Sequence, residues 1–345
     1  MLIKKTIPAP LARPLINKGV SRFPWVLLFV VAFCVWFVYT SLTPQLPDAR
    51  HPIHLYSNQC QQDLRATLLS AIRQASSSIH LVMFGLSDKA ILNALAEKIQ
   101  DNIPTQIFYD AGGSAKIYKL LRGAQVHPIQ HAGLMHQKIL VLDKELIFLG
   151  SANMTSASLK MHDNLVIGLK SRAMAKFLEE HQPYSSGYFR TMVGGQELQL
   201  WLLPDPRGAA LADLRKKIRS AKNSIRIALF TLTHPGLIDE ISAAHRRGIQ
   251  VTVVIDMHAG SGASAKAVEA LRKAGASVFL SRGIQLLHHK FIYIDEKTLV
   301  TGSANWTKAA FYKNSDCILA IDNLTKEQQK FMNSLWKQVA SATQQ

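Results

Sequence analysis

Two short motifs of identical spacing contain side chains that can act on a phosphate ester. Each follows the pattern His-x-Lys-x4-Asp, and the residues are His136, Lys138 and Asp143 in the first copy and His288, Lys290 and Asp295 in the second. About 0.1 copies of even a looser form of this pattern are expected by chance. An imidazole can attack phosphorus or protonate a leaving oxygen, and an ammonium group stabilises charge on phosphoryl oxygens. The motifs therefore predict chemistry on a phosphodiester.

A second block follows each motif at the same distance. Gly-Ser-Ala-Asn begins 14 residues after His136 and 14 residues after His288. Its side chains would add neutral donors to the phosphate oxygens; they are Ser151, Asn153, Ser303 and Asn305. The alternative is that the block only turns the chain after a strand. We favour phosphate binding because the block occurs twice at one offset.

The residues around each motif have the composition of a buried β-strand. In residues 136–142 and 288–294, side chains two apart project from one face, so each histidine points together with its lysine. Pairing the two copies would bring two imidazoles and two ammonium groups into one site.

The motifs belong to an internal repeat that positions them. The corresponding β-rich runs are 78–84 with 224–230, 106–110 with 251–256, and 135–143 with 287–295. Amphipathic stretches at 59–75 and 207–222 precede the first pair of runs. Strands that alternate with helices predict an α/β fold with helices flanking a sheet. We expect two such repeats, residues 52–192 and 196–342, related by pseudo-twofold symmetry.

The duplicated motif and its Gly-Ser-x-Asn block resemble the phospholipase D superfamily over about residues 52–342, and within it short membrane-anchored proteins of the bacterial type. The resemblance implies two α/β/α sandwiches with one active site at their interface. It also implies phosphodiester cleavage without a metal or other cofactor, through a phosphohistidine intermediate. The histidine of the N-terminal half, His136, would be the nucleophile, and His288 would protonate the leaving alcohol.

The aspartates of the two halves have different expected roles. Asp143 and Asp295 complete the catalytic motif of the superfamily, but they have the opposite strand parity and stand where hairpin turns are expected, so we interpret them as structural. Asp163 and Asp316 follow their histidines by 27 and 28 residues, where the superfamily places an acidic residue. A carboxylate on one ring nitrogen would fix the tautomer and raise the basicity of the imidazole.

Charge and cysteine content limit the partners and the compartment. The formal net charge is +17, and five basic residues in 1–22 leave +12 for the remainder, which favours an anionic partner such as a phospholipid membrane or a nucleic acid. None of the three cysteines forms a Cys-x-x-Cys pair, so no zinc site is indicated. We expect Cys60 and Cys317 to be free thiols, with a bridge between them as the alternative.

The N-terminal region has the pattern of a membrane anchor. Residues 23–42 contain no charge and follow a basic leader, residues 1–22, and a short proline-containing linker, residues 43–51, comes next. About 20 apolar residues suffice to cross a bilayer as a helix. The pattern predicts a single-pass membrane protein with a cytoplasmic N-terminus and its catalytic domain on the far side of the membrane. A cleaved signal peptide is the alternative.

Three reactions fit the same catalytic residues. A phospholipase D would hydrolyse glycerophospholipids to phosphatidic acid and a free headgroup, and this is the function we predict because an anchor would hold the site near lipid. A metal-independent endonuclease is an alternative that the basic surplus also fits. A phosphatidyltransferase like cardiolipin synthase is the other. A non-catalytic lipid-binding module is disfavoured because no motif histidine or lysine is missing.

Overall fold

The chain divides into two compact units after Thr43. A computed structural model describes residues 23–42, 44–114, 117–283 and 285–344. The first unit contains helix α1 (Phe23–Leu42), and the second contains both motifs. The basic leader, residues 1–22, lies outside the described residues.

Helix α1 forms over the run that was predicted to span a membrane, but the prediction of a membrane span is not upheld. Within the described residues, no helix is both long enough and apolar enough to cross a bilayer. The predicted single-pass topology, with a cytoplasmic N-terminus and a catalytic domain across the membrane, is therefore wrong.

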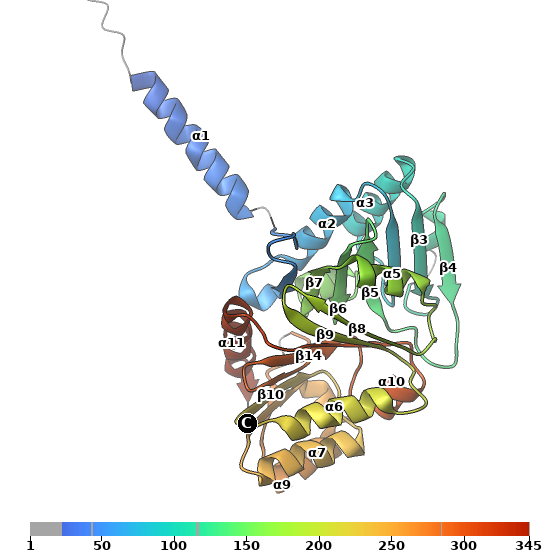
Figure 1. Ribbon diagram of the computed structural model, residues 1–345, viewed down its shortest axis with the longest axis vertical. Coiled ribbons are helices and arrows are strands. Elements are labelled where there is room, and N and C mark those ends of the chain that lie inside the picture. The colour runs from blue at the N-terminus through green and yellow to red at the C-terminus, as the bar shows by residue number, and fades with distance from the viewer. Residues whose placement is uncertain (1–22, 43, 115–116, 284, 345) are drawn as a thin grey trace, which may run out of the picture. The chain divides into compact units, whose positions relative to one another are not determined.

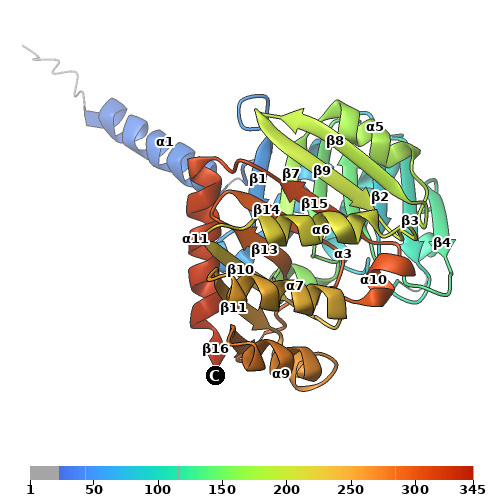
Figure 2. The ribbon, with the colours of Figure 1, turned by 60° about the horizontal axis from the view of Figure 1, so that its bottom comes forward.

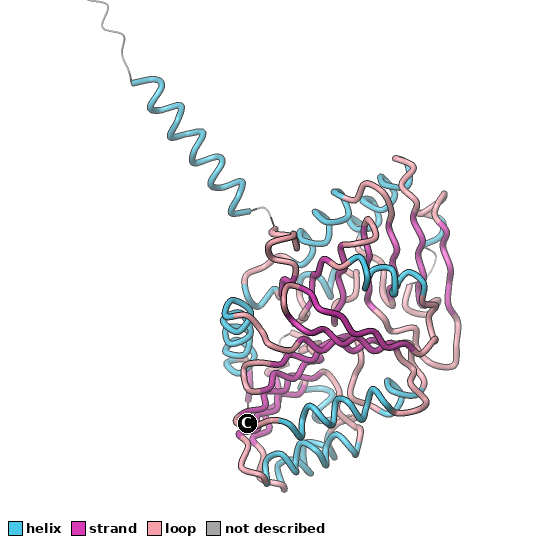
Figure 3. The backbone as a smooth tube through the Cα atoms, viewed as in Figure 1, coloured by secondary structure: helices cyan, strands magenta, loops and turns pink. Residues whose placement is uncertain are grey.

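The second unit contains two mixed sheets (Figures 1 and 3). The strands of the first are β1 (Ile53–Tyr56), β2 (Ile79–Met83), β3 (Thr105–Asp110), β4 (Gln125–Ile129), β5 (Lys138–Leu142), β6 (Leu146–Gly150) and β7 (Val166–Lys170). Their order is β1-β7-β6-β5-β2-β3-β4, with β2, β3 and β4 parallel. All residues of β2 and β5 are buried, which explains their nearly continuous apolar sequences.

The second sheet repeats this arrangement. Its strands are β8 (Gly187–Val193), β9 (Gln196–Leu202), β10 (Ser224–Leu229), β11 (Gln250–Ile255), β12 (Ser277–Ser281), β13 (Lys290–Ile294), β14 (Thr298–Gly302), β15 (Cys317–Ile321) and β16 (Thr343–Gln344). The order is β16-β12-β11-β10-β13-β14-β15-β9-β8. Strands β9 to β15 thus reproduce the seven-strand order of the first sheet, and β8 and β16 extend its edges. The predicted duplication of an α/β unit agrees with this topology.

Helices cover the outer face of each sheet, and one helix per repeat lies on the inner face (Figures 1 and 2). On the first sheet, α2 (Leu64–Gln74) and α3 (Lys89–Gln100) pack outside and α5 (Arg172–Glu180) packs inside. On the second, α6 (Ala209–Ser220), α7 (Pro235–Arg246) and α9 (Ala265–Lys273) pack outside and α11 (Lys326–Ser341) packs inside. The short helices are η1 (Asn58–Cys60), η2 (Ile117–Lys119), α4 (Ser156–Lys160), α8 (Met257–Ser261) and α10 (Lys308–Tyr312).

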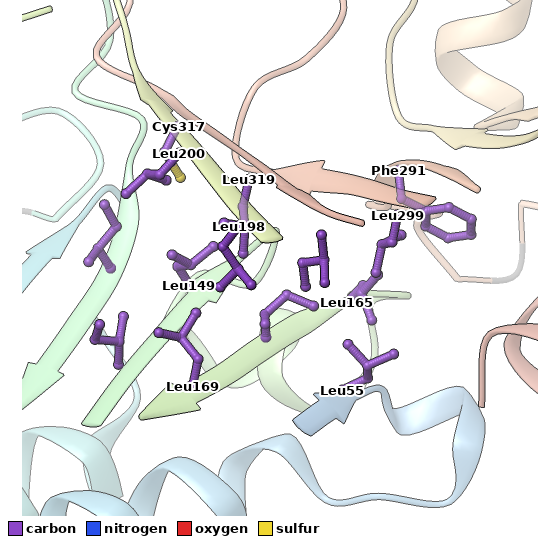
Figure 4. Close-up of a cluster of buried hydrophobic side chains, with 14 of the residues drawn as sticks. Leu55, Leu149, Leu165, Leu169, Leu198, Leu200, Phe291, Leu299, Cys317 and Leu319 are labelled. Carbon is purple, nitrogen blue, oxygen red and sulfur yellow. The ribbon is translucent and has the colours of Figure 1, made fainter. Parts of the chain in front are cut away.

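A single hydrophobic cluster joins the inner faces of the two sheets. Figure 4 shows Leu149 and Leu169 of the first sheet near Leu198 and Leu319 of the second. Each of these four side chains is at most 1% exposed, and full burial of a leucine contributes roughly 2 kcal/mol to folding. This shared core fixes the two repeats relative to each other, as a site built from both requires.

Candidate active site

The two motif histidines lie at backbone bridges that join the repeats. Met135 pairs with Ser315, and Asp163 pairs with Leu287. The N–H of His136 donates to the Ser315 carbonyl at 2.7 Å, and the N–H of His288 donates to the Asp163 carbonyl at 3.0 Å. Because each bridge lies one residue before a histidine, both imidazoles are placed at the junction of the repeats.

The two motif lysines have nearly identical surroundings. Nζ of Lys138 donates to the His136 carbonyl at 2.7 Å, and Nζ of Lys290 donates to the His288 carbonyl at 2.9 Å. Each ammonium also lies over an aromatic ring, 5.2 Å from the Phe84 centroid in one repeat and 5.3 Å from the Phe230 centroid in the other. Both lysines are 2% exposed, so the site holds two buried cations.

The partner of the first histidine comes from the second repeat. Nδ1 of His136 lies 2.8 Å from Oδ1 of Asp316, which is fully buried. The hydroxyl of Ser303 donates to the same oxygen at 2.6 Å. Asp316 accepts, so Nδ1 carries the proton and Nε2 keeps its lone pair when the ring is neutral. The sequence identified Asp316 as a candidate partner of a histidine. It did not indicate that this histidine would be His136 of the other repeat.

The partner of the second histidine is an amide, and this corrects the expectation for Asp163. Nδ1 of His288 lies 3.0 Å from Oδ1 of Asn164. The amide nitrogen of Asn164 donates to the carbonyl of Ser158 at 2.9 Å, which directs the oxygen toward the ring. The backbone of Asp163 joins the repeats, because its N–H donates to the Leu286 carbonyl and its carbonyl accepts the N–H of His288. Asn164 therefore occupies the place where a carboxylate was predicted.

The two serines of the Gly-Ser-Ala-Asn blocks support the histidine partners. Ser151 donates to Oδ1 of Asn164 at 2.8 Å, as Ser303 does to Asp316. Both hydroxyls also accept a backbone N–H, and both residues are fully buried. A hydroxyl has one proton to donate, so the expectation that these serines bind phosphate is corrected to a supporting contact.

The asparagines of the same blocks lie at equivalent, partly buried positions. The side-chain oxygens of Asn153 and Asn305 are both buried without a hydrogen-bond partner in the described part of the chain. Buried amides normally have partners, so a bound ligand is one explanation of this matched pair. Their predicted contact with phosphate remains a prediction.

The motif aspartates are placed away from the histidines. Asp143 accepts the backbone N–H groups of residues 76–78, and Asp295 accepts those of residues 222–224. Both have positive φ, 53° and 51°, in the turns of the β5–β6 and β13–β14 hairpins. These contacts agree with the structural interpretation and give neither carboxylate a catalytic position.

Burial and mutual repulsion shift the site toward uncharged imidazoles. Burial, with the charge of Lys138, lowers the pKa of His136, while Asp316 opposes this shift. The pKa of His288 is lowered well below its usual value by burial and by both lysines. Burial lowers the pKa of Lys138 to about 8 and, with repulsion from Lys138, lowers that of Lys290 well below its usual value. These interactions also show that the four groups share one site.

Several residues of the site were not identified from the sequence. They are Asn164, the ring residues Phe84 and Phe230, and His162, whose ring lies 6.1 Å from that of His288. Asn164 could have been found, because it stands 28 residues after His136 just as Asp316 stands 28 after His288. Within the described residues, no group of three or more His, Cys, Asp or Glu side chains is arranged to hold a metal.

Comparison with known families agrees with this geometry. The family described as a cardiolipin synthase, PLD-like domain matches residues 68–182 and 214–338, more than half of the chain. The chain belongs to the phospholipase D superfamily. The superfamily resemblance first seen in the motifs is therefore confirmed.

Relatives within the superfamily have names connected with lipids. A mitochondrial cardiolipin hydrolase of Xenopus laevis is 32% identical over 137 residues, which is 39% of this chain and 65% of the relative. A cardiolipin synthase of Staphylococcus aureus is 24% identical over 299 residues, which is 72% of this chain and 59% of the relative. The chain thus matches less than two thirds of the length of either relative.

A solved structure shares the fold of most of the chain. Phosphatidylserine synthase of Haemophilus influenzae has a TM-score of 0.69 and 13% sequence identity, with 88% of this chain and 89% of that chain covered. At this identity the similarity describes the phospholipase D fold alone.

Proposed function

We propose that this phospholipase D superfamily member hydrolyses glycerophospholipids to phosphatidic acid and a free headgroup. The observation that carries the proposal is the composite site, in which two imidazoles and two buried ammonium groups from both repeats meet. Each imidazole has its Nδ1 hydrogen-bonded within the protein, which leaves Nε2 for the substrate. The relatives named cardiolipin hydrolase and cardiolipin synthase support a lipid substrate.

The proposed reaction has two displacements at phosphorus. Nε2 of His136 attacks, an N–P bond forms, and the P–O bond to the headgroup breaks while His288 donates its proton to the leaving oxygen. The negative substrate phosphate raises the pKa of His288, so the acid is charged when substrate is bound. Water then attacks phosphorus, His288 accepts its proton, and the N–P bond breaks to release phosphatidic acid.

Lys138 and Lys290 stabilise the charge that develops on the phosphoryl oxygens. An ammonium group has three N–H donors, and each lysine uses one of them on a motif histidine carbonyl. The remaining donors are available to the nonbridging oxygens. In a buried site such fixed charges act more strongly than they would in water.

Phosphatidyl transfer is the second candidate. The Staphylococcus aureus relative, matched over 72% of this chain, is named a cardiolipin synthase. The same phosphohistidine would pass the phosphatidyl group to an alcohol instead of water. The choice depends on which acceptor reaches the intermediate, so product analysis distinguishes the two reactions.

We expect the full chain to cleave phospholipid in the presence of excess chelator, because the buried lysines supply the positive charge that a metal would otherwise provide. The assay incubates the protein in EDTA with mixed micelles of cardiolipin or phosphatidylglycerol, with and without glycerol, and separately with single-stranded DNA and RNA. Release of phosphatidic acid supports hydrolysis. Formation of cardiolipin from phosphatidylglycerol, or of a new glycerol ester when glycerol is added, indicates transfer. Cleavage of nucleic acid alone, or activity that requires an added divalent ion, would contradict the proposal.

The matched control for this assay is His131→Asn. His131 lies five residues before His136, but its ring stacks on Tyr184 at 3.9 Å and does not belong to the histidine pair. Activity that survives in His131→Asn and disappears in His136→Asn would exclude a contaminating enzyme.

A further inference from the structure

Two buried carboxylates outside the motifs occupy matching positions behind the site. Asp110 ends β3, and Asp256 directly follows β11. Oδ2 of Asp110 accepts the N–H of Met135 at 3.0 Å, and Oδ2 of Asp256 accepts the N–H of Leu287 at 3.2 Å. Met135 and Leu287 are the residues that immediately precede the two site histidines. Each carboxylate therefore holds the peptide from which a histidine is presented.

The second oxygen of each carboxylate holds the turn that follows its strand. Oδ1 of Asp110 accepts the N–H groups of residues 112 and 113, at 2.9 and 2.8 Å. Oδ1 of Asp256 accepts those of residues 258 and 259, at 3.0 and 3.1 Å. All these donors are neutral, and none of the ion pairs among the described residues includes either carboxylate. Neither carboxylate therefore forms a direct ion pair within 4.0 Å among the described residues.

The two charges act on the motif lysines. Asp110 opposes the lowering of the pKa of Lys138, and Asp256 opposes that of Lys290, in both cases together with Asp316. Burial alone would favour the neutral amine, which could not stabilise a phosphoryl oxygen. A buried cation normally requires a compensating charge.

We propose that Asp110 and Asp256 are positioning residues, each of which holds the peptide that precedes one site histidine and provides a buried counter-charge for the adjacent motif lysine. This inference rests on the proposed function for its kinetic consequence, but not for its effect on the lysines.

Other titratable groups near the lysines are few. Lys138 also faces the thiol of Cys317, whose pKa burial raises to about 11, so it stays neutral over the assay range. Lys290 also faces His162 and the two site histidines, whose pKa values are lowered. Burial and the charge of Asp256 raise the pKa of Asp163 to about 7, so its carboxyl becomes charged as the pH rises through neutrality.

The test compares Asp110→Asn and Asp256→Asn with Asp143→Asn and Asp295→Asn. The control carboxylates also accept backbone N–H groups of three residues each, but they lie at the far end of strands β5 and β13, about 16 Å along the strand from the lysines. In the full chain carrying ¹³Cε-lysine, NMR titration follows each lysine, with signals assigned by their loss in Lys138→Met and Lys290→Met.

We expect Asp110→Asn to lower the titration midpoint of Lys138 by about 1 pH unit. The pH at which kcat/KM falls on the alkaline side of its profile, the alkaline limb, should move down by about the same amount. Asp256→Asn should do the same through Lys290, with kcat lowered roughly 10- to 100-fold in each variant. Asp110→Glu keeps the charge and should retain the wild-type limb despite a lower kcat. The control variants should lower Tm without moving either limb.

An Asp110→Asn or Asp256→Asn protein that is folded by circular dichroism, and whose lysines titrate as in the wild type, would overturn the proposal. A shift equal to that of the controls would also overturn it, because it would indicate a general loss of structure. The NMR titration needs no substrate, so it decides the question even if the wild-type chain cleaves no phospholipid.

Discussion

Replacement of His136 by asparagine is expected to lower kcat/KM for phospholipid cleavage by about 10⁴-fold or more. The change removes Nε2, the atom that would form the N–P bond, while an amide of similar size remains near Asp316. Burial and Lys138 lower the pKa of His136, so in the wild type this ring is neutral and nucleophilic at neutral pH. The measurement is initial-rate kinetics in mixed micelles over a range of pH.

The companion variant His288→Asn separates the two roles. It should be severely impaired with a natural headgroup but less so with p-nitrophenol as leaving group, because that alcohol needs little protonation to depart. Equal losses in His136→Asn and His288→Asn with the activated substrate would contradict the assignment of nucleophile and acid.

Replacement of Asp316 by asparagine is expected to lower kcat roughly 10²- to 10⁴-fold. Asp316 accepts from Nδ1 of His136, and its charge also favours protonation of both motif lysines. The asparagine would no longer stabilise the imidazole as positive charge develops during attack. Circular dichroism and Tm serve as controls, because Asp316 also accepts from Ser303 within the core.

The reciprocal exchange, Asp316→Asn with Asn164→Asp, provides a sharper test of the same idea. The two positions are equivalent in the repeats, so the exchange moves the carboxylate from His136 to His288 and keeps the net charge. We expect partial recovery relative to Asp316→Asn alone, with the roles of the two histidines exchanged. Recovery with the nucleophile still at His136 would show that the position of the carboxylate does not decide which of the two histidines is the nucleophile.

The superfamily and the repeat were predictable because they depend on local order in the sequence. His136 and Lys138 lie together because they are two apart in an extended segment, and Asp143 occupies a turn because the strand ends there. The strand order of the two sheets agrees with the duplicated pattern of β-rich runs.

What could not be predicted is contact across the repeats. No pattern in either half shows that Asp316 reaches His136 while Asn164 reaches His288, since these contacts depend on how the shared core docks the sheets. The serines were misassigned because burial decides whether a hydroxyl faces a ligand or the protein. The apolar run at 23–42 predicted a helix correctly, but the membrane span inferred from it was wrong.

The most direct test of the whole account is to locate the covalent intermediate. The His288→Asn chain is mixed with the p-nitrophenyl phosphodiester and quenched in alkaline denaturant, because an N–P bond hydrolyses in acid, and peptides are then mapped by mass spectrometry. Loss of the base that activates water should let the intermediate accumulate, and we predict a phosphoryl adduct on His136 that is absent from His136→Asn. An adduct on any other residue, or its persistence in His136→Asn, would contradict the account.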